Sequence, residues 1–219
     1  MYEEKFADEE KIPVLMCLNW KYGAVLKGLP FRRGRLLDLG CGKGLFLAFA
    51  QKYYGFQASG VDFNSRAASI ARDTLHLRDI YNMSFEEFFK IHQSACYDVI
   101  TFFEVLEHLG DPVGFLKNLK EFLVPGGYIG FSVPNRDNWY KIRIENDYPP
   151  YHLTRWNRRA ISHILDIAGY EVVKIQAPPV FQEVIGRHIS LGGIGRRLIR
   201  NAMQESSGIN RGNKLKIIK

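Results

Sequence analysis

Three glycines and two aspartates have the spacing of a nucleoside-binding turn. Residues 36–44 read Leu-Leu-Asp-Leu-Gly-Cys-Gly-Lys-Gly, and the next apolar stretch ends in Asp62, 22 residues after Gly40. Glycine has no Cβ, so the backbone of Gly40, Gly42 and Gly44 can approach a ligand closely, and the N–H groups that open a following helix face the same space. An acid at the end of a second strand accepts hydrogen bonds from ribose hydroxyls. The pattern therefore predicts a nucleoside site.

The spacing of the glycines separates two classes of ligand. Dinucleotide folds have the pattern G-x-G-x-x-G, whose third glycine lets the helix pack closely on the strand beside a pyrophosphate. Here the pattern is G-x-G-x-G, and Asp38 stands two residues before the first glycine. A carboxylate at that position would repel a pyrophosphate and attract an ammonium group. The residues therefore favour S-adenosylmethionine, which carries an α-ammonium group and a ribose, over a tight turn in some other α/β protein.

The elements that position these residues alternate along the chain. Apolar runs predict strands near residues 36–39, 58–61, 79–83, 97–103 and 128–133, and helical patterns lie between most of them. This alternation is typical of a doubly wound α/β fold, in which ligands bind at the carboxyl ends of parallel strands. The residues expected on that rim are Asp38–Gly44, Asp62, Ser84, Phe85, Glu104 and Asn135.

After the fifth strand the sequence predicts a loop, a helix and a further strand. Trp139–Trp156 contains Pro149-Pro150, and its apolar residues follow neither helical nor strand periodicity. We therefore expect a loop over the sheet. Asn157 is a helix N-cap by type, and Gly169 fits the position after the helix end. Tyr170–Ile175 then forms the predicted sixth strand.

We expect one domain, 1–219, with three parts. Residues 1–32 form a predicted N-terminal helical lid, in which Pro13–Leu29 has near-helical spacing of apolar residues and ends before Pro30. Residues 33–176 form the cofactor-binding core. Residues 177–219 form a basic C-terminal segment, in which Lys214–Ile218 is a candidate last strand.

Charge and cysteine content limit the partners. The chain has 30 Lys and Arg against 23 Asp and Glu, a net charge of +7, and the residues from Arg187 onward carry all of that excess. The core is neutral, which makes nucleic acid an unlikely partner. The tail mixes arginines with apolar residues, so peripheral contact with an anionic membrane is an alternative to a solvated segment. Three cysteines without a C-x-x-C pair, and no apolar run of membrane-spanning length, indicate a cytoplasmic protein.

Four motifs, in order, resemble the class I S-adenosylmethionine-dependent methyltransferases. The first is Asp-x-Gly-x-Gly-x-Gly at residues 38–44. Tyr97–Asp111 and Leu123–Asn135 resemble the fourth-strand motif, and the one after it, of the ubiquinone-biosynthesis O-methyltransferases and their relatives. Pro149–Trp156 is similar to their Pro-Pro-x-His-Leu-x-x-aromatic segment. The resemblance covers residues 33–176 and implies a mostly parallel seven-stranded sheet with helices on both faces.

The resemblance assigns the methionine end of the cofactor to the first motif and the fourth strand. By that likeness, Asp38 and the Gly40–Gly44 loop hold the methionine moiety, and Glu104 flanks it. Cys41 stands between two glycines and is expected to offer its backbone to the ligand.

The adenosine end is assigned to the ends of the second and third strands. Asp62 would bind both ribose hydroxyls, and Phe63 would pack on the adenine. Many relatives have an Asp after the third strand, where this chain has Ser84, so the adenine contact passes to the Ser84 hydroxyl and the Phe85 backbone.

His152 is the candidate catalytic base. An oxygen acceptor must lose its proton, and histidine titrates near neutral pH. Its loop follows the fifth strand and can reach the cleft. The alternative is a structural histidine that hydrogen-bonds the backbone of a proline-rich loop.

Glu104, Glu107 and His108 form a Glu-x-x-Glu-His triplet, which resembles one found in some quinone and small-RNA 2′-O-methyltransferases and could bind a divalent ion. Acids also favour helix N-termini. No second histidine or cysteine stands beside the triplet at ligand spacing, so we predict no metal site.

Together these features predict a methyltransferase that acts on a small molecule, at oxygen. The rivals are an RNA methyltransferase, favoured by the basic tail, and a non-catalytic cofactor-binding subunit that serves a partner.

Overall fold

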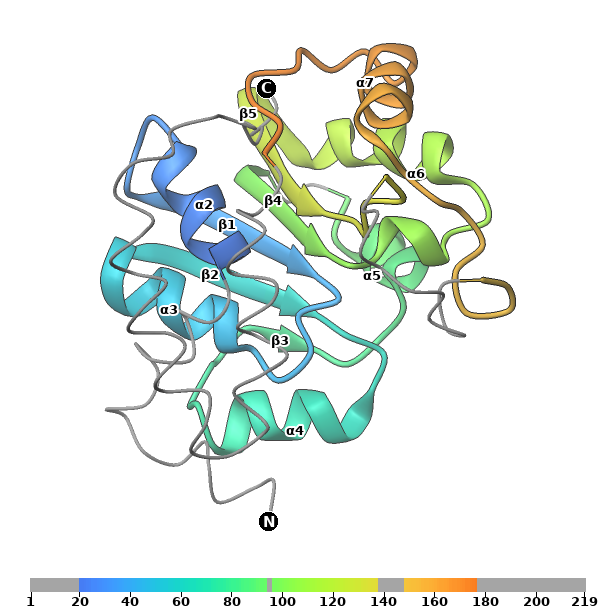
Figure 1. The fold of residues 1–219 in the computed structure, drawn as a ribbon. Helices are drawn as coiled ribbons and strands as arrows, with labels where there is room; N and C mark the ends of the chain where they lie inside the picture. The colour runs from blue at the N-terminus through green and yellow to red at the C-terminus, as the bar shows by residue number, and fades with distance from the viewer. Residues whose placement is uncertain (1–19, 94–95, 138–147, 177–219) are drawn as a thin grey trace, which may run out of the picture.

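A five-stranded parallel sheet forms the centre of the molecule (Figure 1). The computed structural model describes residues 20–93, 96–137 and 148–176. The strand order is β3-β2-β1-β4-β5, with all four neighbouring pairs parallel. The strands are β1 (Gly34–Leu39), β2 (Phe56–Val61), β3 (Ile80–Tyr81), β4 (Tyr97–Phe103) and β5 (Leu123–Ser132). The order reverses at β1, so the predicted doubly wound fold is confirmed.

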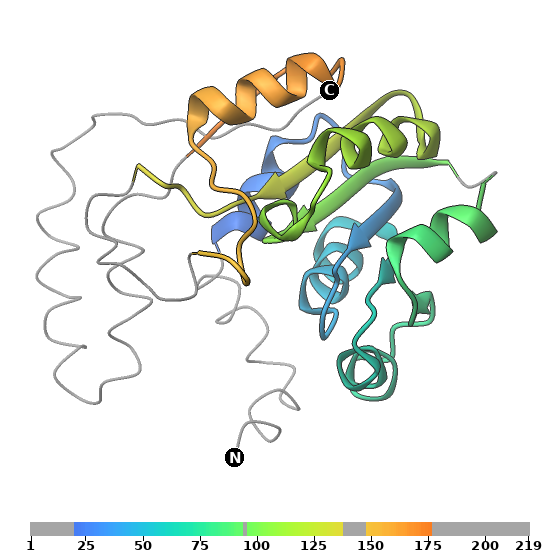
Figure 2. The same cartoon turned by 90° about the vertical axis from the view of Figure 1, so that its right-hand side faces the viewer.

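Helices cover both faces of the sheet. The helices are α2 (Trp20–Gly28), α3 (Leu45–Tyr54), α4 (Ser65–Asp73), α5 (Phe85–Ile91), α6 (Pro112–Leu119) and α7 (Arg158–Ile167), with 3₁₀ turns η2 (Leu106–His108) and η3 (Lys120–Phe122). One buried cluster joins α5, α6 and α7 to the sheet, and a second joins α2, α3 and α4 to it. Figure 2 shows α6 and α7 together on one side of the strands. The two clusters fix the sheet between two helical layers.

The sheet differs from the prediction in its edges. Within the described residues it has five strands rather than seven, and Tyr170–Ile175 forms no strand. The candidate strand Lys214–Ile218 lies outside the described residues. β5 begins at Leu123 instead of Tyr128, because Leu123 pairs with Tyr97 and an irregularity in register carries the chain through Pro125-Gly126-Gly127. The strand predicted near residues 128–133 therefore begins earlier, before these turn-forming residues.

The described part of the predicted lid is α2, and it packs on the sheet. Val25 and Leu26 are buried. A Cβ on Gly130 of β5 would come within 2.6 Å of Val25 Cγ1, so the glycine lets the helix lie close to the strand. Residues 1–19 of the predicted lid lie outside the described residues.

Two helix boundaries are confirmed by their caps. The Asn157 side chain accepts a hydrogen bond from the Ala160 N–H, which caps α7 at its start. Gly169 has φ +73°, the left-handed conformation that ends a helix. These caps orient the segment that follows the candidate site.

Candidate cofactor and acceptor site

Glycine is required in the turn after β1 for two separate reasons. Gly40 has φ +73°, and a Cβ there would meet Val105 Cγ2 at 2.8 Å. Gly42 has φ +53° and would meet nothing within 4 Å of such a Cβ. Gly40 is therefore held by packing against the segment after β4, whereas Gly42 borders open space where a ligand can approach.

The backbone of this turn is tied to β2. The N–H groups of Gly40 and Cys41 both donate to the Val61 carbonyl oxygen, at 2.8 and 3.1 Å, and the Gly44 N–H donates to the Cys41 carbonyl oxygen. The backbone of Cys41 therefore takes part in the hydrogen bonds that shape the turn, and its contact with the ligand stays a prediction. Its sulfur lies against Gly60, and burial raises the pKa of the thiol above its usual range. Cys41 acts as a core residue.

Asp62 stands at the end of β2 with its carboxylate already oriented. Oδ2 accepts from the Gly42 N–H at 2.7 Å, and Oδ1 accepts from the Asn64 N–H at 2.8 Å. Each carboxylate oxygen can accept a second hydrogen bond. The next residue, Phe63, is 79% exposed. Asp62 and Phe63 thus offer an acceptor for hydroxyl groups beside an aromatic ring free to pack on a base.

Asp38 is a buried acid at the same edge. Its side chain is 2% exposed, and Oδ1 accepts from the Thr101 hydroxyl at 2.7 Å. Burial raises the pKa of Asp38 to about 8, the Thr101 hydrogen bond lowers it, and the charge of Asp62 raises it. A cation bound nearby would favour the ionised form. This buried acid therefore suits a ligand that brings its own positive charge.

Ser84 and Phe85 open α5. The Ser84 hydroxyl accepts from the Glu87 N–H at 3.2 Å, and Glu87 Oε2 accepts from the Ser84 N–H at 2.8 Å, which completes a capping box. The Ser84 hydroxyl keeps its proton for another acceptor. The Phe85 ring packs towards Phe115, 5.9 Å between centroids. Both residues lie after β3, at the predicted place.

Glu104 follows β4 in a conformation that is rare for a residue with a side chain. Its φ is +57°, and its N–H donates to the Ser132 carbonyl oxygen at 3.0 Å. Oε1 accepts from Ser132 Oγ at 2.7 Å and from Lys21 Nζ at 2.8 Å. Lys21 was not among the predicted site residues, because no local pattern in the sequence marks a partner 83 residues away.

The loop after β5 is tied to the turn after β4. The N–H groups of Leu153 and Thr154 donate to the Glu107 carbonyl oxygen at 2.8 and 3.1 Å, and Thr154 Oγ1 donates to the Leu106 carbonyl oxygen. Asn135 and Trp156 form a parallel bridge. The predicted proline-rich loop therefore rests on η2.

This contact brings two histidines and a glutamate together. One ligand atom each of Glu107, His108 and His152 lies within 4.8 Å of the others, and the two imidazole centroids are 4.9 Å apart. His108 Nδ1 lies 2.7 Å from the Tyr151 carbonyl oxygen. A carbonyl oxygen can only accept, so Nδ1 carries the hydrogen and leaves Nε2 for a proton or a metal ion.

This cluster overturns the premise of the metal prediction. We expected no second histidine beside Glu107 and His108, and His152 takes that place from a distant loop. Glu107 is 1% exposed, His108 is exposed, and His152 is half-buried. The arrangement is able to take a proton from an acceptor or to hold a divalent ion.

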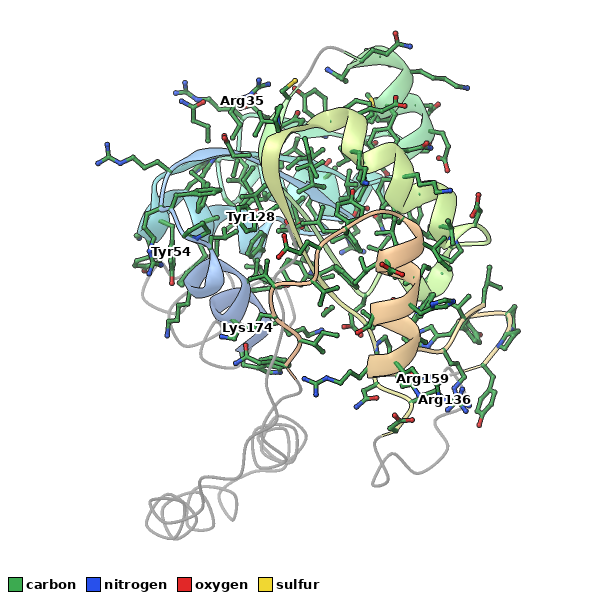
Figure 3. The ribbon with its side chains drawn as sticks, turned by 90° about the horizontal axis from the view of Figure 1, so that it is seen from above. Arg35, Tyr54, Tyr128, Arg136, Arg159 and Lys174 are labelled. Carbon is green, nitrogen blue, oxygen red and sulfur yellow. The ribbon has the colours of Figure 1, made fainter. Side chains whose placement is uncertain are left out.

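Other surfaces lie apart from these residues. In Figure 3, Arg35 of β1 and Tyr128 of β5 lie well away from Arg136 and Arg159. An open hollow of about 890 Å³ lies along α7 and includes Arg159 and Asp166 in its wall, but none of the predicted cofactor residues. Among the described residues, no helix is long and apolar enough to cross a membrane.

Comparison with known proteins gives three findings. A family model described as "Methyltransferase domain" matches residues 19–175. The ubiquinone biosynthesis O-methyltransferase of Nitrosospira multiformis is 36% identical over 107 residues, 47% of this chain and 44% of that protein. The chain thus spans about half the length of the curated relatives it matches.

Solved structures share the fold. A SAM-dependent methyltransferase from Archaeoglobus fulgidus has a TM-score of 0.60 at 21% identity, covering 99% of this chain and 96% of that one. The plantazolicin methyltransferase BpumL, in complex with SAH, has a TM-score of 0.61 at 16% identity, covering 97% and 86%.

Proposed function

Because the chain belongs to the family defined by this methyltransferase domain, we propose that it transfers a methyl group from S-adenosylmethionine to an oxygen atom of a small molecule. The observation that carries the proposal is the pairing of two sites at one edge of the sheet. Asp38, the glycine turn and Asp62 stand at the ends of β1 and β2, and His152 is held beside the turn that follows β4. A methyl donor and an acceptor require this adjacency.

The cofactor half provides binding. Asp38 receives the ammonium group, whose positive charge favours the ionised carboxylate in its buried pocket. Asp62 accepts from the ribose hydroxyls, and the exposed ring of Phe63 packs on the adenine. The cofactor itself provides the leaving group through its sulfonium, so the protein must only align the two reactants.

The acceptor half removes a proton. Glu107 is buried and the Nδ1 of His108 is engaged by the Tyr151 carbonyl oxygen, so we assign the removal of the acceptor proton to the half-buried His152. The Leu153 and Thr154 N–H groups donate to the Glu107 carbonyl oxygen, and these two hydrogen bonds fix the position of the His152 loop on η2. A base positioned in this way raises the nucleophilicity of the acceptor oxygen as the methyl group moves.

A second arrangement uses the same three side chains as metal ligands. Two imidazoles and a carboxylate suit a divalent transition metal, and the Nδ1–H of His108 bonded to a carbonyl is the support that metal-binding histidines usually have. Such an ion would lower the pKa of an acceptor hydroxyl bound to it. His152 would then be a ligand instead of a base.

The choice of oxygen and of a small acceptor is supported by the relatives, which are named ubiquinone biosynthesis O-methyltransferases. The acceptor itself would be bound by the loop that carries Tyr148 and Tyr151, both exposed. An RNA substrate and a non-catalytic subunit are the rival proposals, and the neutral core argues against the first. A cytoplasmic location and contact of the basic tail with a membrane stay predictions.

Methyl-labelled S-adenosylmethionine incubated with the protein and a metabolite extract tests the proposal. We expect label in a small organic product, in an ether linkage that survives mild base. Label in RNA, or no cofactor consumption with any fraction of the extract, would contradict it. An extract treated with ribonuclease separates the first of these outcomes from the expected one.

A further inference from the structure

A group of exposed cations lies at the amino ends of β1 and β2. The five residues of this basic face are Lys27 in the last turn of α2, Arg32, Arg33 and Arg35 around the start of β1, and Lys52 in the last turn of α3. Residues 20–61 carry seven Lys and Arg against one acid, Asp38. The neutral total charge of the core therefore hides a strong local excess of positive charge.

Contacts between neighbouring elements bring these cations together. Arg32 Nη1 lies 3.5 Å from the Leu26 carbonyl oxygen of α2, and the Arg32 guanidinium carbon lies 4.9 Å from the centre of the Tyr54 ring at the end of α3. The guanidinium carbon of Arg35 lies 5.1 Å from the ring of Tyr97 in β4. Figure 3 shows Arg35 and Tyr54 on the same side of the molecule. A guanidinium group stacked on a ring can still donate from its edge to a planar anion.

The three arginines of the basic face are not neutralised by carboxylates in the described part of the chain. No ion pair there joins an acid to Arg32, Arg33 or Arg35. Asp98 lies at the same edge, but its Oδ2 accepts from the backbone N–H of Arg35 at 2.7 Å. Cations that lie close together repel each other, so the basic face favours a partner with several negative charges.

The side chains around the basic face favour a nucleic acid over a membrane or a protein. Within residues 20–61, all of which the structure describes, Tyr53 is the exposed large apolar side chain, and no large aliphatic side chain is exposed. A membrane surface or a stable protein interface needs such apolar side chains. Lys52 Nζ lies 5.9 Å from the Tyr53 ring. Arginines suit phosphate groups, and an exposed aromatic ring can stack on an unpaired base.

The opposite edge of the sheet carries acids instead. Asp38, Asp62 and Glu104 lie at the carboxyl ends of β1, β2 and β4. We propose that the basic face binds the phosphate backbone of a single-stranded nucleic acid, at the edge opposite the candidate site. Carboxylates repel phosphates from the candidate site, so the bound strand is a partner and not the methyl acceptor. The inference goes beyond the proposed function and does not depend on it.

Fluorescence anisotropy of a labelled oligouridylate, titrated with the full chain at several salt concentrations, tests the proposal. The edge variant combines Arg32→Gln, Arg33→Gln and Arg35→Gln. The control variant combines three substitutions in the basic C-terminal segment, Arg196→Gln, Arg197→Gln and Arg200→Gln. In the edge variant, the slope of log K against log salt should decrease by about 2, because each lost phosphate contact on a single strand removes about 0.7. Its affinity near about 0.1 M salt should fall roughly tenfold to a hundredfold, while the control stays close to the wild type.

Two further measurements separate loss of charge from loss of fold. A variant with Arg32→Lys, Arg33→Lys and Arg35→Lys keeps the charges and should keep the salt dependence of the wild type. The affinity of the edge variant for S-adenosylhomocysteine should be unchanged, because the predicted cofactor residues lie at the other edge of the sheet.

Three results would overturn the proposal. The first is wild-type affinity for oligouridylate in the edge variant. The second is a larger loss in the control variant, which would assign the binding to the C-terminal segment. The third is binding of the wild type to phosphatidylglycerol vesicles or to polyglutamate without binding to oligouridylate, which would favour a membrane or an acidic protein as the partner.

Discussion

The two halves of the candidate site are built in different ways. The centre of the cofactor half comes from one continuous stretch, β1, the glycine turn, α3 and β2, which is held by backbone hydrogen bonds to Val61 and by the carboxylate of Asp62. The acceptor half joins the turn after β4 to a loop more than 40 residues later, through Leu153, Thr154 and the histidine pair. A cofactor common to a family permits a fixed local motif, whereas an acceptor that varies between relatives is bound by a loop whose sequence can vary. A substitution in one half should therefore change either cofactor affinity or turnover and leave the other property near that of the wild type.

The largest effect is expected in the acceptor half. His152→Ala should lower kcat by roughly 10²–10⁴-fold, because the acceptor then lacks the group that takes its proton, while cofactor affinity stays near that of the wild type. Steady-state kinetics with labelled cofactor measures both. His163→Ala, which removes an exposed histidine of α7, is the matched control. A variant that only melts at a lower temperature and turns over normally would make His152 structural.

The cofactor half should respond through binding. Asp62→Ala removes the acceptor for the ribose hydroxyls and the anchor of the Gly42 N–H, so affinity for S-adenosylhomocysteine should fall by roughly tenfold to a hundredfold, or about 1.5–3 kcal/mol. Isothermal calorimetry measures the loss. Asp73→Ala, at the exposed end of α4, should change nothing. Unchanged affinity in Asp62→Ala would show that Asp62 does not bind the ribose hydroxyls of the cofactor.

A third effect concerns the stability of the cofactor half. The folded protein holds the proton of Asp38 up to about pH 8, whereas the unfolded chain releases it near pH 3.8. Folding therefore takes up a proton between these values, and the free energy of unfolding should fall as pH rises from about 4 to about 8.

Asp38→Asn should remove this dependence and raise Tm above that of the wild type near pH 8. The amide oxygen can still accept from Thr101, and no buried charge forms. Thermal melts at a series of pH values measure it. Parallel curves for the two proteins would show that Asp38 does not titrate in this window. Binding of the cofactor should be weaker in the variant, which loses the partner of the ammonium group.

The smallest effect is expected from chelation. With His152 as a base, turnover should persist after dialysis against a chelator. Activity that disappears and returns with manganese, zinc or magnesium would show that Glu107, His108 and His152 hold a metal ion. In that case His108→Ala should lose as much activity as His152→Ala, whereas a base predicts a much smaller loss for His108.

The same division explains what could be predicted from the sequence. The glycine turn and Asp62 were identified because their spacing and contacts belong to one strand–turn–helix–strand unit. The sheet was identified by its alternating pattern, but the start of β5 was missed because the pairing of Leu123 with Tyr97 overrides the Pro-Gly-Gly signal. No local pattern shows that residues distant in sequence will meet.

The side-chain contacts that the sequence did not show are all long-range. His108 and Tyr151 are 43 residues apart and Lys21 and Glu104 are 83 apart. Only the histidine next to Glu107 is visible in the local sequence, whereas His152 joins the cluster from a distant loop, so the prediction of no metal site was made without it. The position of Cys41 between two glycines likewise did not show that its N–H bonds to Val61 of the neighbouring strand.

The separation of the two halves is tested most directly by one titration of S-adenosylhomocysteine into Asp62→Ala and His152→Ala side by side. The account predicts a loss of roughly tenfold to a hundredfold in affinity for Asp62→Ala and an affinity near that of the wild type for His152→Ala. Equal losses in both variants would contradict it, because the loop after β5 would then belong to the cofactor half.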